Sequence, residues 1–463
     1  MASALEAALP PEIFRAYDIR GVAGTALTEE GVYALGRAIG TRVRRAGGSE
    51  IVVGRDGRLS GPGLAEALAR GLCAAGCGVL DIGLAPTPVV YFAAYHFECG
   101  SAVAITGSHN PPEYNGLKIM VGGRTLSGED ISSLRSQVLA DDFDTGFGHV
   151  AERDAATPYL ARIAGDVKLA RGLRVAVDCG NGVAGAIAPQ VLEAIGCEVL
   201  PLFTEVDGTF PNHHPDPAKP ENLADLRALI AAQQADLGVA FDGDGDRLGV
   251  VTGDGDIIWP DRIMTLLARD VLERNPGAEI IFDVKCTRHL PRVIAECGGT
   301  PVMWKTGHSF IKTRMAESGA MLAGEMSGHI FFKERWYGFD DGIYSAARLL
   351  EYLSRQRSVP DTFAAIPDSV NTPELQIKVA REGEHFELVE QLKAIADFPG
   401  AEVVTLDGLR VDFADGFGLA RPSNTTPVVV LRFEADNTAA LERIQGAFRD
   451  LFARVAPQLE LPF

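Results

Sequence analysis

The stretch Leu237-Gly238-Val239-Ala240-Phe241-Asp242-Gly243-Asp244-Gly245-Asp246-Arg247 joins a short apolar run to an acidic loop spaced by glycines. The apolar half has the length of a buried strand, and the polar half marks the point where that strand ends. Other short apolar runs rich in β-branched residues, several followed by helix-like stretches, lie at residues 51–53, 102–105, 175–177 and 280–282. This alternation predicts an α/β fold.

The apolar runs stop at polar or glycine-rich clusters. Arg55-Asp56-Gly57 and Ser108-His109-Asn110 follow two of the runs, as the acidic loop follows a third. Open α/β sheets bind their ligands at the carboxyl ends of the strands. The chemistry of this protein is therefore expected at these strand ends.

The chain is long enough for several domains. Its 463 residues exceed what one hydrophobic core usually organises. After about residue 369 the pattern changes to alternating strands (374–379), a hairpin signal at Asp407-Gly408 and two amphipathic helices. We predict three related mixed α/β domains and a smaller C-terminal α+β domain, with boundaries at 1–154, 155–256, 257–368 and 369–463.

The charge of the chain limits its partners. Lys and Arg number 43 against 62 Asp and Glu, which gives a formal net charge of −19. Such a chain repels nucleic acid and anionic membranes, so neither is expected as a partner. An anionic small molecule would need a local pocket of Arg and Lys strong enough to outweigh this field.

The seven cysteines are odd in number and scattered, with no C-x-x-C pair to suggest a zinc or redox site. The first residues lack a basic n-region, and no apolar run approaches the ~18 residues needed to span a bilayer. A cytoplasmic protein is expected.

The loop at residues 106–118 (TGSHNPPEYNGLK) is the first candidate site. Turn chemistry accounts for most of its composition. It does not account for a hydroxyl at Ser108 beside His109, with a cation at Lys118; this set suits a nucleophile or group carrier with proton-transfer groups nearby. Neither G-x-S-x-G nor G-x-x-x-x-G-K-[ST] matches. A plain turn and a catalytic loop both remain open on spacing alone.

The acidic loop is the second candidate, because carboxylates at alternate positions can point at one hard cation: Asp242, Asp244 and Asp246. A Ca²⁺-binding EF-hand needs glycine at its sixth position and glutamate at its twelfth, where this chain has Arg247 and Gly253. The spacing therefore favours Mg²⁺, with a solvated acidic turn as the alternative. Mg²⁺ keeps positions for phosphate oxygens, so the loop would complement a phosphorylated serine.

The run from Gly180 to Gly185 follows a strand, opens a helix and matches G-x-G-x-x-G, with Glu205 and Asp207 downstream. It supports the hypothesis of a dinucleotide site. A tight strand-to-helix crossover also favours glycine. The neighbouring pair His213-His214 suggests a metal site, but no third ligand has suitable spacing and a capped loop is favoured.

Two further loops offer polar sets. Residues 324–329 (GEMSGH) can hydrogen-bond vicinal sugar hydroxyls. Residues 421–426 (RPSNTT) combine a guanidinium with hydroxyl, amide and backbone donors, as an exposed phosphate requires. A hydrogen-bonded turn is the alternative for each.

Together these loops resemble those of the α-D-phosphohexomutase superfamily, specifically its bacterial phosphomannomutase/phosphoglucomutase branch, along the whole chain. Residues 106–118 resemble the phosphoserine loop, 242–247 the metal loop, 324–329 the sugar-binding loop and 421–425 the phosphate-binding loop. Residues 14–21 (FRAYDIRG) resemble the family's N-terminal active-site segment. The resemblance implies four domains around a central active-site cleft.

The resemblance also implies a reaction and its residues. Hexose 1-phosphate and hexose 6-phosphate would be interconverted through phosphorylated Ser108 and a bound 1,6-bisphosphate, with Mg²⁺ as cofactor and glucose 1,6-bisphosphate as activator. The implied catalytic residues are Ser108, His109, Lys118 and Arg247. The implied metal ligands are Ser108, Asp242, Asp244 and Asp246. The implied substrate contacts are Tyr17, Arg20, Lys285, His308, Glu325, Ser327, His329, Arg421, Ser423, Asn424 and Thr425.

Two other classes stay open at this point. One is an NAD-dependent oxidoreductase built on the run from Gly180 to Gly185, and the other is a non-catalytic protein that binds a metal or a sugar phosphate. Phosphosugars are the expected partners, and a monomer is expected. The sequence does not choose between mannose and glucose.

Overall fold

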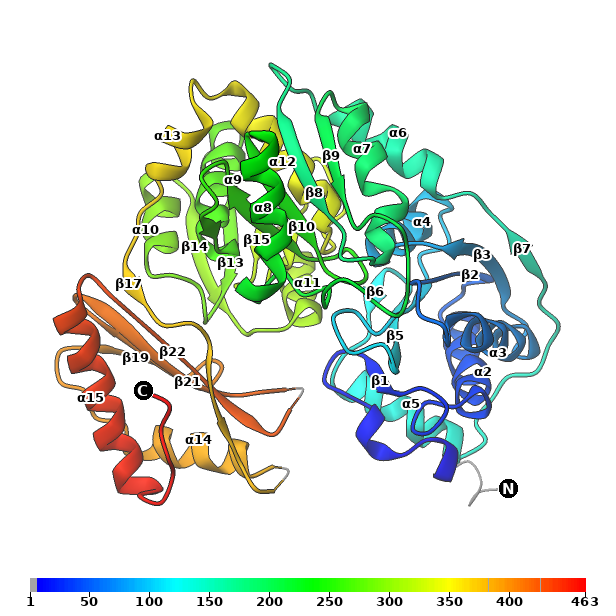
Figure 1. Ribbon diagram of the computed structural model, residues 1–463. Coiled ribbons are helices and arrows are strands. Elements are labelled where there is room, and N and C mark those ends of the chain that lie inside the picture. Colours follow the sequence, from blue (N-terminus) through cyan, green and yellow to red (C-terminus); the bar gives the residue numbers. More distant parts are fainter. Residues whose placement is uncertain (1–5, 382, 425) are drawn as a thin grey trace.

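The computed structural model describes residues 6–463 apart from 382 and 425. Its strands form four sheets. We call each sheet with its helices a unit, numbered in chain order. The units follow one another along an arc, so that the first and the fourth face each other across the open side (Figure 1).

The first unit has a seven-stranded sheet in the order β1-β5-β4-β2-β3-β7, with β6 paired to β5. The strands β2, β3, β4 and β7 run parallel. The strands are β1 (Ile19–Val22), β2 (Glu50–Arg55), β3 (Gly78–Leu84), β4 (Ala102–Ile105), β5 (Tyr114–Val121), β6 (Arg124–Thr125) and β7 (Val150–Glu152). The helices are η1 (Pro11–Ile13), α2 (Glu29–Arg45), α3 (Gly61–Ala74), α4 (Thr87–His96) and α5 (Glu129–Leu139).

The second unit has a five-stranded sheet in the order β12-β11-β10-β8-β9. The strands are β8 (Arg174–Asp178), β9 (Glu198–Leu202), β10 (Leu237–Phe241), β11 (Leu248–Thr252) and β12 (Ile257–Ile258). The helices are α6 (Ala156–Asp166), η2 (Val183–Ala186), α7 (Ala188–Ala194), η3 (Pro220–Leu223) and α8 (Ala224–Gln233). Strand β10 is buried along its whole length, as expected for a strand covered on both faces.

The third unit has a four-stranded sheet in the order β14-β13-β15-β16. The strands are β13 (Glu279–Asp283), β14 (Thr300–Trp304), β15 (Leu322–Gly324) and β16 (Ile330–Phe332). The helices are α9 (Pro260–Arg274), α10 (His289–Glu296), α11 (His308–Ser318), α12 (Gly342–Arg355) and α13 (Val359–Ala364).

The fourth unit is different, because its six-stranded sheet is antiparallel, in the order β17-β22-β21-β20-β19 with β18 paired to β22. The strands are β17 (Val370–Asn371), β18 (Leu375–Lys378), β19 (Glu402–Val404), β20 (Leu409–Phe413), β21 (Gly416–Pro422) and β22 (Val428–Ala435). Two helices accompany it, α14 (Glu384–Ile395) and α15 (Thr438–Val455).

The buried apolar residues show how the units are joined. One cluster runs through the first three units, from α4 through the second sheet to α9 and α12. The fourth unit has a cluster of its own, and its apolar link to the third is a small group of Val284, Phe417 and Leu419. The first three units therefore share a continuous core that the fourth does not join.

The predicted fold class is confirmed. Each of the five apolar runs forms a strand, namely β2, β4, β8, β10 and β13, and the hairpin signal at Asp407-Gly408 joins β19 to β20. The exact domain boundaries stay a prediction; the second sheet continues to β12, two residues past the predicted end at 256. No helix among the described residues has both the length and the apolar character needed to cross a membrane.

Candidate active site

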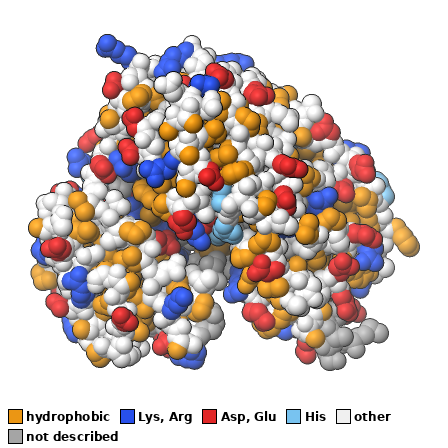
Figure 2. Space-filling model, viewed as in Figure 1, with side chains coloured by type: hydrophobic (Ala, Val, Ile, Leu, Met, Phe, Trp, Pro, Cys, Tyr) orange, Lys and Arg blue, Asp and Glu red, His pale blue; other side chains and the backbone are white. Residues whose placement is uncertain are grey.

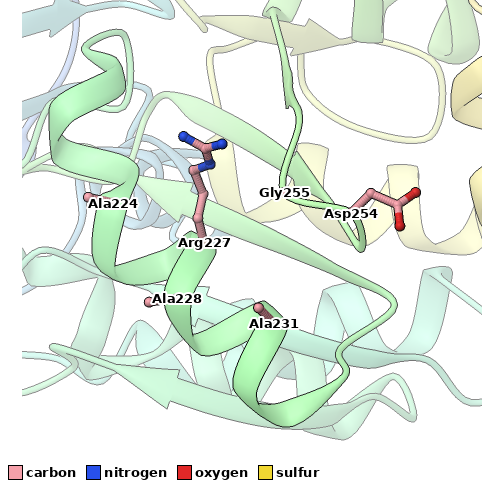
Figure 3. Close-up of a pocket in the computed structure, with 6 residues that line it drawn as sticks. All are labelled: Ala224, Arg227, Ala228, Ala231, Asp254 and Gly255. Atoms are coloured by element: carbon pink, nitrogen blue, oxygen red, sulfur yellow. The ribbon is translucent and has the colours of Figure 1, made fainter.

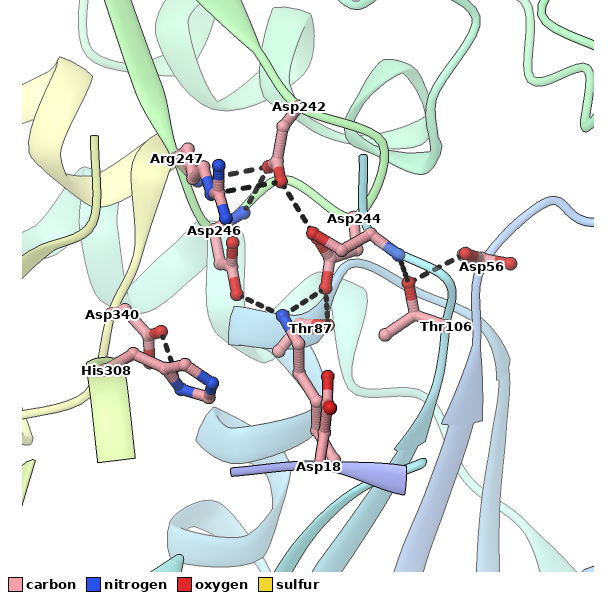
Figure 4. A network of polar contacts seen from close by, with 12 residues as sticks. Asp18, Asp56, Thr87, Thr106, Asp242, Asp244, Asp246, Arg247, His308 and Asp340 are labelled. Atoms are coloured by element: carbon pink, nitrogen blue, oxygen red, sulfur yellow. Dashed lines mark hydrogen bonds and ion pairs between the residues drawn. The ribbon is translucent and has the colours of Figure 1, made fainter. Parts of the chain in front are cut away.

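The acidic loop connects β10 to the antiparallel strand β11 and carries three fully buried carboxylates. One oxygen from each of Asp242, Asp244 and Asp246 lies within 4.8 Å of the others (Figure 4). The backbone N–H groups of Asp246 and Arg247 both donate to Asp242 Oδ1 at 3.1 Å. The first aspartate thus closes the loop on itself and holds the other two in place.

The first unit supplies the partners of these carboxylates. Lys118 lies on β5 rather than in the preceding loop, and its Nζ donates to Asp244 Oδ2 at 2.7 Å and to Asp246 Oδ2 at 2.5 Å. Thr87, the first residue of α4, donates its hydroxyl to Asp244 Oδ2 at 2.5 Å. The cluster therefore forms only when the first two units are packed together.

The electrostatics of the cluster are uneven. Burial and the neighbouring carboxylates raise the pKa of Asp242 well above 3.8. Burial acts in the same direction on Asp244, but the Lys118 ammonium outweighs it and lowers the pKa of Asp244 below 3.8. Burial lowers the pKa of Lys118, and Asp244 with Asp246 reverses this and raises it well above 10.5. Lys118 is therefore a charged ammonium here.

The cluster fits a hard cation. Asp244 Oδ1 and Asp246 Oδ1 are buried without a hydrogen-bond partner among the described residues. Such oxygens cost free energy unless something binds them. A divalent cation with oxygen ligands would satisfy both at once.

A second group of possible ligands shares Asp246 with His329 and Asp340. His329 Nε2 accepts a hydrogen bond from Arg247 Nε at 3.0 Å, so the neutral ring carries its hydrogen on Nδ1. That Nδ1 lies 3.1 Å from Asp340 Oδ2. An N–H in this position leaves no lone pair for a metal, so the group of three aspartates is the better site.

Ser108 lies at the edge of the acidic cluster. Its Oγ donates to Asp242 Oδ2 at 3.0 Å and lies 3.1 Å from His109 Nδ1. Its φ is +49°, a left-handed conformation that is uncommon for a residue with a side chain. Burial, followed by the charge of Arg247, lowers the pKa of His109 well below 6.5, so this imidazole is neutral.

The N-terminal segment reaches both the serine loop and the third unit. Arg20 donates to Asn110 Oδ1 at 2.6 Å and pairs with Asp18. The Tyr17 ring meets the His308 ring edge-on, with centroids 5.3 Å apart. Burial among its neighbours raises the pKa of Tyr17 to about 12, so its hydroxyl stays protonated.

The third unit contributes a hydrogen-bonded set of buried polar groups. Glu325 Oε1 accepts the Gly307 N–H, and Ser327 Oγ donates to Glu325 Oε2 at 3.2 Å. His308, the first residue of α11, stacks on His329 with centroids 5.3 Å apart. One hydroxyl and one carboxylate two residues apart in a loop suit the hydroxyls of a sugar.

The fourth unit presents an arginine with a free donor. Arg421 on β21 donates Nε to Asp407 Oδ2 at 3.1 Å, while its buried Nη2 has no hydrogen-bond partner among the described residues. Ser423 is buried and Asn424 half-buried. Thr425 lies outside the described residues.

Contacts between neighbouring units bring the predicted residues together. Lys118 joins the first unit to the second, and Arg247 joins the second to the third through His329. Lys285 joins the third to the fourth, because its Nζ donates to Glu374 Oε2 at 3.1 Å. The space-filling view shows a hollow between the first and fourth units, with histidine side chains gathered at its upper end (Figure 2).

The run from Gly180 to Gly185 has a structural explanation. A Cβ on Gly185 would lie 2.1 Å from Thr204 O, and one on Gly182 would lie 3.0 Å from atoms of Gly243. These glycines are needed because the chain packs closely on itself, and this explains the motif without a bound pyrophosphate. In the same region His213 Nε2 lies 3.1 Å from Asp178 Oδ2, and His214 contacts the carbonyl of His109.

A separate surface depression of about 380 Å³ lies on the outer side of α8 (Figure 3). Its lining is largely alanine, with Arg227 and Asp254 as the charged residues. None of the predicted site residues lines it.

Sequence reasoning missed several polar residues that complete the site: Asp56, Arg58, Thr87, Lys312 and Asp340. The cluster at 55–57 was a usable signal, because it ends β2 next to the serine loop. The others gave no signal, since most of their contacts in the site join distant parts of the chain, such as Thr87 with Asp244 and Lys312 with Asp340.

Four family models match consecutive parts of the chain. They describe the α/β/α domains I, II and III of phosphoglucomutase/phosphomannomutase, at residues 11–145, 157–255 and 259–369, and its C-terminal domain, at residues 374–451. The chain belongs to the phosphoglucomutase/phosphomannomutase family.

Individual relatives in this family resemble the chain from end to end. The phosphomannomutase/phosphoglucomutase of Pseudomonas putida is 57% identical over 464 residues, 100% of both chains. The phosphoglucomutase of Neisseria gonorrhoeae is 55% identical over 447 residues, 96% of this chain and 97% of the relative. A crystal structure of a phosphoglucomutase/phosphomannomutase family protein from Burkholderia thailandensis superimposes with a TM-score of 0.94 at 54% identity, covering 98% of this chain and 100% of that one.

Proposed function

We propose that this family member interconverts the 1-phosphate and 6-phosphate of a hexose, mannose, glucose or both, through a phosphorylated Ser108. The observation that carries the proposal is the position of the Ser108 hydroxyl, 3.0 Å from Asp242 in the buried acidic cluster and 3.1 Å from His109. A serine in this setting can carry a phosphoryl group beside a cation and a proton-transfer group.

The proposed step moves one phosphoryl group. The bond between phosphorus and Ser108 Oγ breaks while a bond forms from phosphorus to the free hydroxyl oxygen of the bound hexose phosphate. The proton of that hydroxyl leaves to a base, and the released serine oxygen regains one from an acid. His109 and Lys118 are the proposed acid and base. His109 Nδ1 is within hydrogen-bonding distance of Ser108 Oγ, and Lys118 Nζ donates to Asp244 in the acidic cluster. The bound 1,6-bisphosphate then reorients and returns its other phosphoryl group to Ser108.

We propose that the metal is Mg²⁺ and that its ligands are Asp242, Asp244, Asp246 and an oxygen of phosphorylated Ser108. Such a cation would neutralise charge on the group being transferred. The unpartnered oxygens Asp244 Oδ1 and Asp246 Oδ1 support this assignment.

The substrate would be held by residues from the first, third and fourth units. Glu325 and Ser327 suit the sugar hydroxyls, with Tyr17 and His308 beside them. Arg421 suits the phosphate that does not react, because its buried Nη2 is without a partner in the described part of the chain. The remaining proposed contacts are Arg20, Lys285, His329, Ser423, Asn424 and Thr425. Two of them, Arg20 and Lys285, are cations that would attract a phosphate despite the net charge of −19.

The alternative of an NAD-dependent oxidoreductase has no support, since the glycine run fills its own space and the relatives carry mutase names. Turnover of a hexose phosphate would rule out the alternative of a non-catalytic binding protein.

The test is a coupled assay of glucose 1-phosphate to glucose 6-phosphate, with Mg²⁺ and a trace of glucose 1,6-bisphosphate as activator, repeated with mannose 1-phosphate. We expect activity that EDTA abolishes and that falls by about 10³-fold or more in Ser108→Ala, because the covalent carrier is gone. Intact mass should show one phosphate on the wild type and none on the variant. Full activity in Ser108→Ala would remove Ser108 as the carrier.

The remaining expectations are also proposals. We propose that the enzyme is a monomer, that it is cytoplasmic, and that its domain boundaries lie near 154, 256 and 368. A site built from units of one chain favours the monomer. Light scattering coupled to gel filtration checks the first point, since a dimer mass would overturn it.

A further inference from the structure

Arg58 is a buried arginine directly beneath the serine loop, in the turn between β2 and α3. Its side chain is 0% exposed. A guanidinium has five N–H donors, and each of the five has an acceptor here. Nε donates to Asp56 Oδ2 at 3.1 Å, and the four others donate to backbone carbonyls.

All four carbonyls belong to residues 108–114, which are the serine loop and the first residue of β5. Nη2 donates to Ser108 O at 2.8 Å and to Asn110 O at 2.6 Å, and Nη1 donates to Tyr114 O at 2.9 Å and to Pro111 O. One cation therefore gathers the carbonyls of a seven-residue segment around itself. Charge-assisted bonds of this kind are stronger than neutral ones, and a planar fork fixes directions as well as distances.

Asp56 fixes both ends of this arrangement. Its Oδ2 accepts the Thr106 hydroxyl at 2.7 Å and the Gly107 N–H at 3.2 Å, and its Oδ1 accepts the Arg58 N–H at 3.0 Å. The chain entering the serine loop and the guanidinium beneath it are thus tied to one carboxylate.

Close neighbours on two sides hold the Arg58 guanidinium in this position. A Cβ on Gly107 would lie 2.4 Å from Arg58 Cζ, so the guanidinium occupies the space where a side chain would be. From the second unit, the Phe210 ring lies 5.2 Å from Arg58 Cζ. Arg58 of the first unit therefore holds the serine loop, and Phe210 of the second unit covers the guanidinium.

Ser108 needs such support because its φ of +49° is unfavourable for a residue with a side chain. Its carbonyl, bound by Arg58, is also the atom against which Gly243 packs, at 2.3 Å from a Cβ placed there. Releasing this carbonyl would let the peptide rotate and would carry Oγ away from Asp242.

We propose that Arg58 is a positioning residue for the phosphoryl-carrying serine: by binding four carbonyls of the loop, it holds Ser108 in the left-handed conformation that aims Oγ at the acidic cluster. This inference rests on the proposed function. It predicts a defect in the transfer step, because Arg58 makes no hydrogen bond to the proposed substrate contacts Lys285, Glu325 and Arg421.

The test compares Arg58→Met and Arg58→Lys with the wild type. We expect Arg58→Met to lower kcat by about 100-fold, since a misplacement near 1 Å costs about that much, while KM stays within about 3-fold. The single-turnover rate from phosphorylated enzyme to glucose 1-phosphate, followed by intact mass, should fall by the same factor. Arg58→Lys should recover part of the rate, because it restores the cation but not the fork.

Arg348→Met is the matched control. Arg348 is also 0% exposed, but its ion pairs lie within the third unit. It should lose thermal stability and keep kcat within about 3-fold at 20 °C, so that a kcat loss in Arg58→Met cannot come from weakened folding alone.

The outcomes separate the two proposals. An inactive wild type overturns the proposed function and this inference with it. An active wild type beside an Arg58→Met variant with near-normal kcat overturns this inference alone, as does a loss that follows only the unfolded fraction. If Arg58→Met does not fold, Arg58→Lys carries the test, and an unchanged single-turnover rate in that variant overturns the inference.

Discussion

Asp341 is a buried carboxyl group whose ionisation should control the stability of the shared core. It is the N-cap of α12 and is 1% exposed. The Tyr344 N–H donates to Oδ1 at 2.8 Å, and the Tyr159 hydroxyl lies 2.8 Å from Oδ1 and 2.9 Å from Oδ2. Because Tyr159 is on α6 and Asp341 starts α12, this group links the second unit to the third.

The size of the effect follows from its pKa. Burial raises the pKa of Asp341 from 3.8 to about 7, and the hydrogen bonds from Tyr344 and Tyr159 oppose burial only in part. The folded chain then keeps a proton that the unfolded chain has released, so stability is greatest below about pH 4 and falls as the pH rises through about 7. Between pH 5 and pH 8 this one group should cost the fold about 3 kcal/mol.

The assay is urea unfolding at pH 5 and pH 8, followed by circular dichroism, for the wild type and Asp341→Asn. Asparagine keeps the shape and an acceptor for the Tyr344 N–H, but it does not titrate. The drop in unfolding free energy from pH 5 to pH 8 should therefore be smaller in the variant by about 3 kcal/mol. Asp154→Asn is the matched control, since Asp154 also accepts a hydrogen bond at a helix start, from the Thr157 N–H, and its pKa is lowered.

A pH dependence that is the same in the wild type and in Asp341→Asn would refute the reasoning. It would mean that the hydrogen bonds at the helix start outweigh burial and keep the carboxylate ionised at pH 5. A variant that is less stable than the wild type by the same amount at both pH values would lead to the same conclusion.

Two further predictions concern buried groups near and far from the site. Thr87→Val removes a hydroxyl that donates to Asp244, so the Mg²⁺ concentration for half-maximal activity should rise about 10-fold. Thr87→Ser keeps the hydroxyl and should stay near the wild type. Equal Mg²⁺ titrations of Thr87→Val and the wild type would contradict this role. Arg348→Met removes the fully buried one of the two arginines that pair with both Asp270 and Glu334, so urea unfolding should show a loss of about 3 to 5 kcal/mol. A loss below about 1 kcal/mol would show that the other arginines of that network compensate.

The sequence was sufficient where the physics is local. A buried strand shows as a short apolar run, and the polar loop after it shows as a break in that run, so β4 with the Ser108 loop and β10 with the acidic loop could both be predicted. The spacing of Asp242, Asp244 and Asp246 also encodes its geometry, because alternate residues of a tight loop face the same point.

The rest could not be predicted because its contacts join distant positions. Lys118 was expected in a loop beside Ser108, but it extends from β5 into the second unit. Arg58 binds backbone carbonyls 50 to 56 residues away, and a carbonyl has no sequence signature. The glycines from Gly180 to Gly185 were ambiguous for the opposite reason, since close packing and phosphate binding select the same residue.

The division of the apolar core bears on how such a site could serve both ends of one substrate. Ser108 and the acidic cluster belong to units that share a core, so their geometry is fixed by packing. Arg421 belongs to the fourth unit, which meets the third through a small apolar group and through a set of polar contacts. These contacts include Arg410 Nη1 with the carbonyls of Val284 and Cys286, Arg432 with Asp261, and Lys285 with Glu374. Polar contacts of this kind resemble those of transient interfaces and re-form readily. If the bisphosphate must turn between the two transfers, we expect the fourth unit to release its phosphate while the serine, its loop and the three aspartates stay in place.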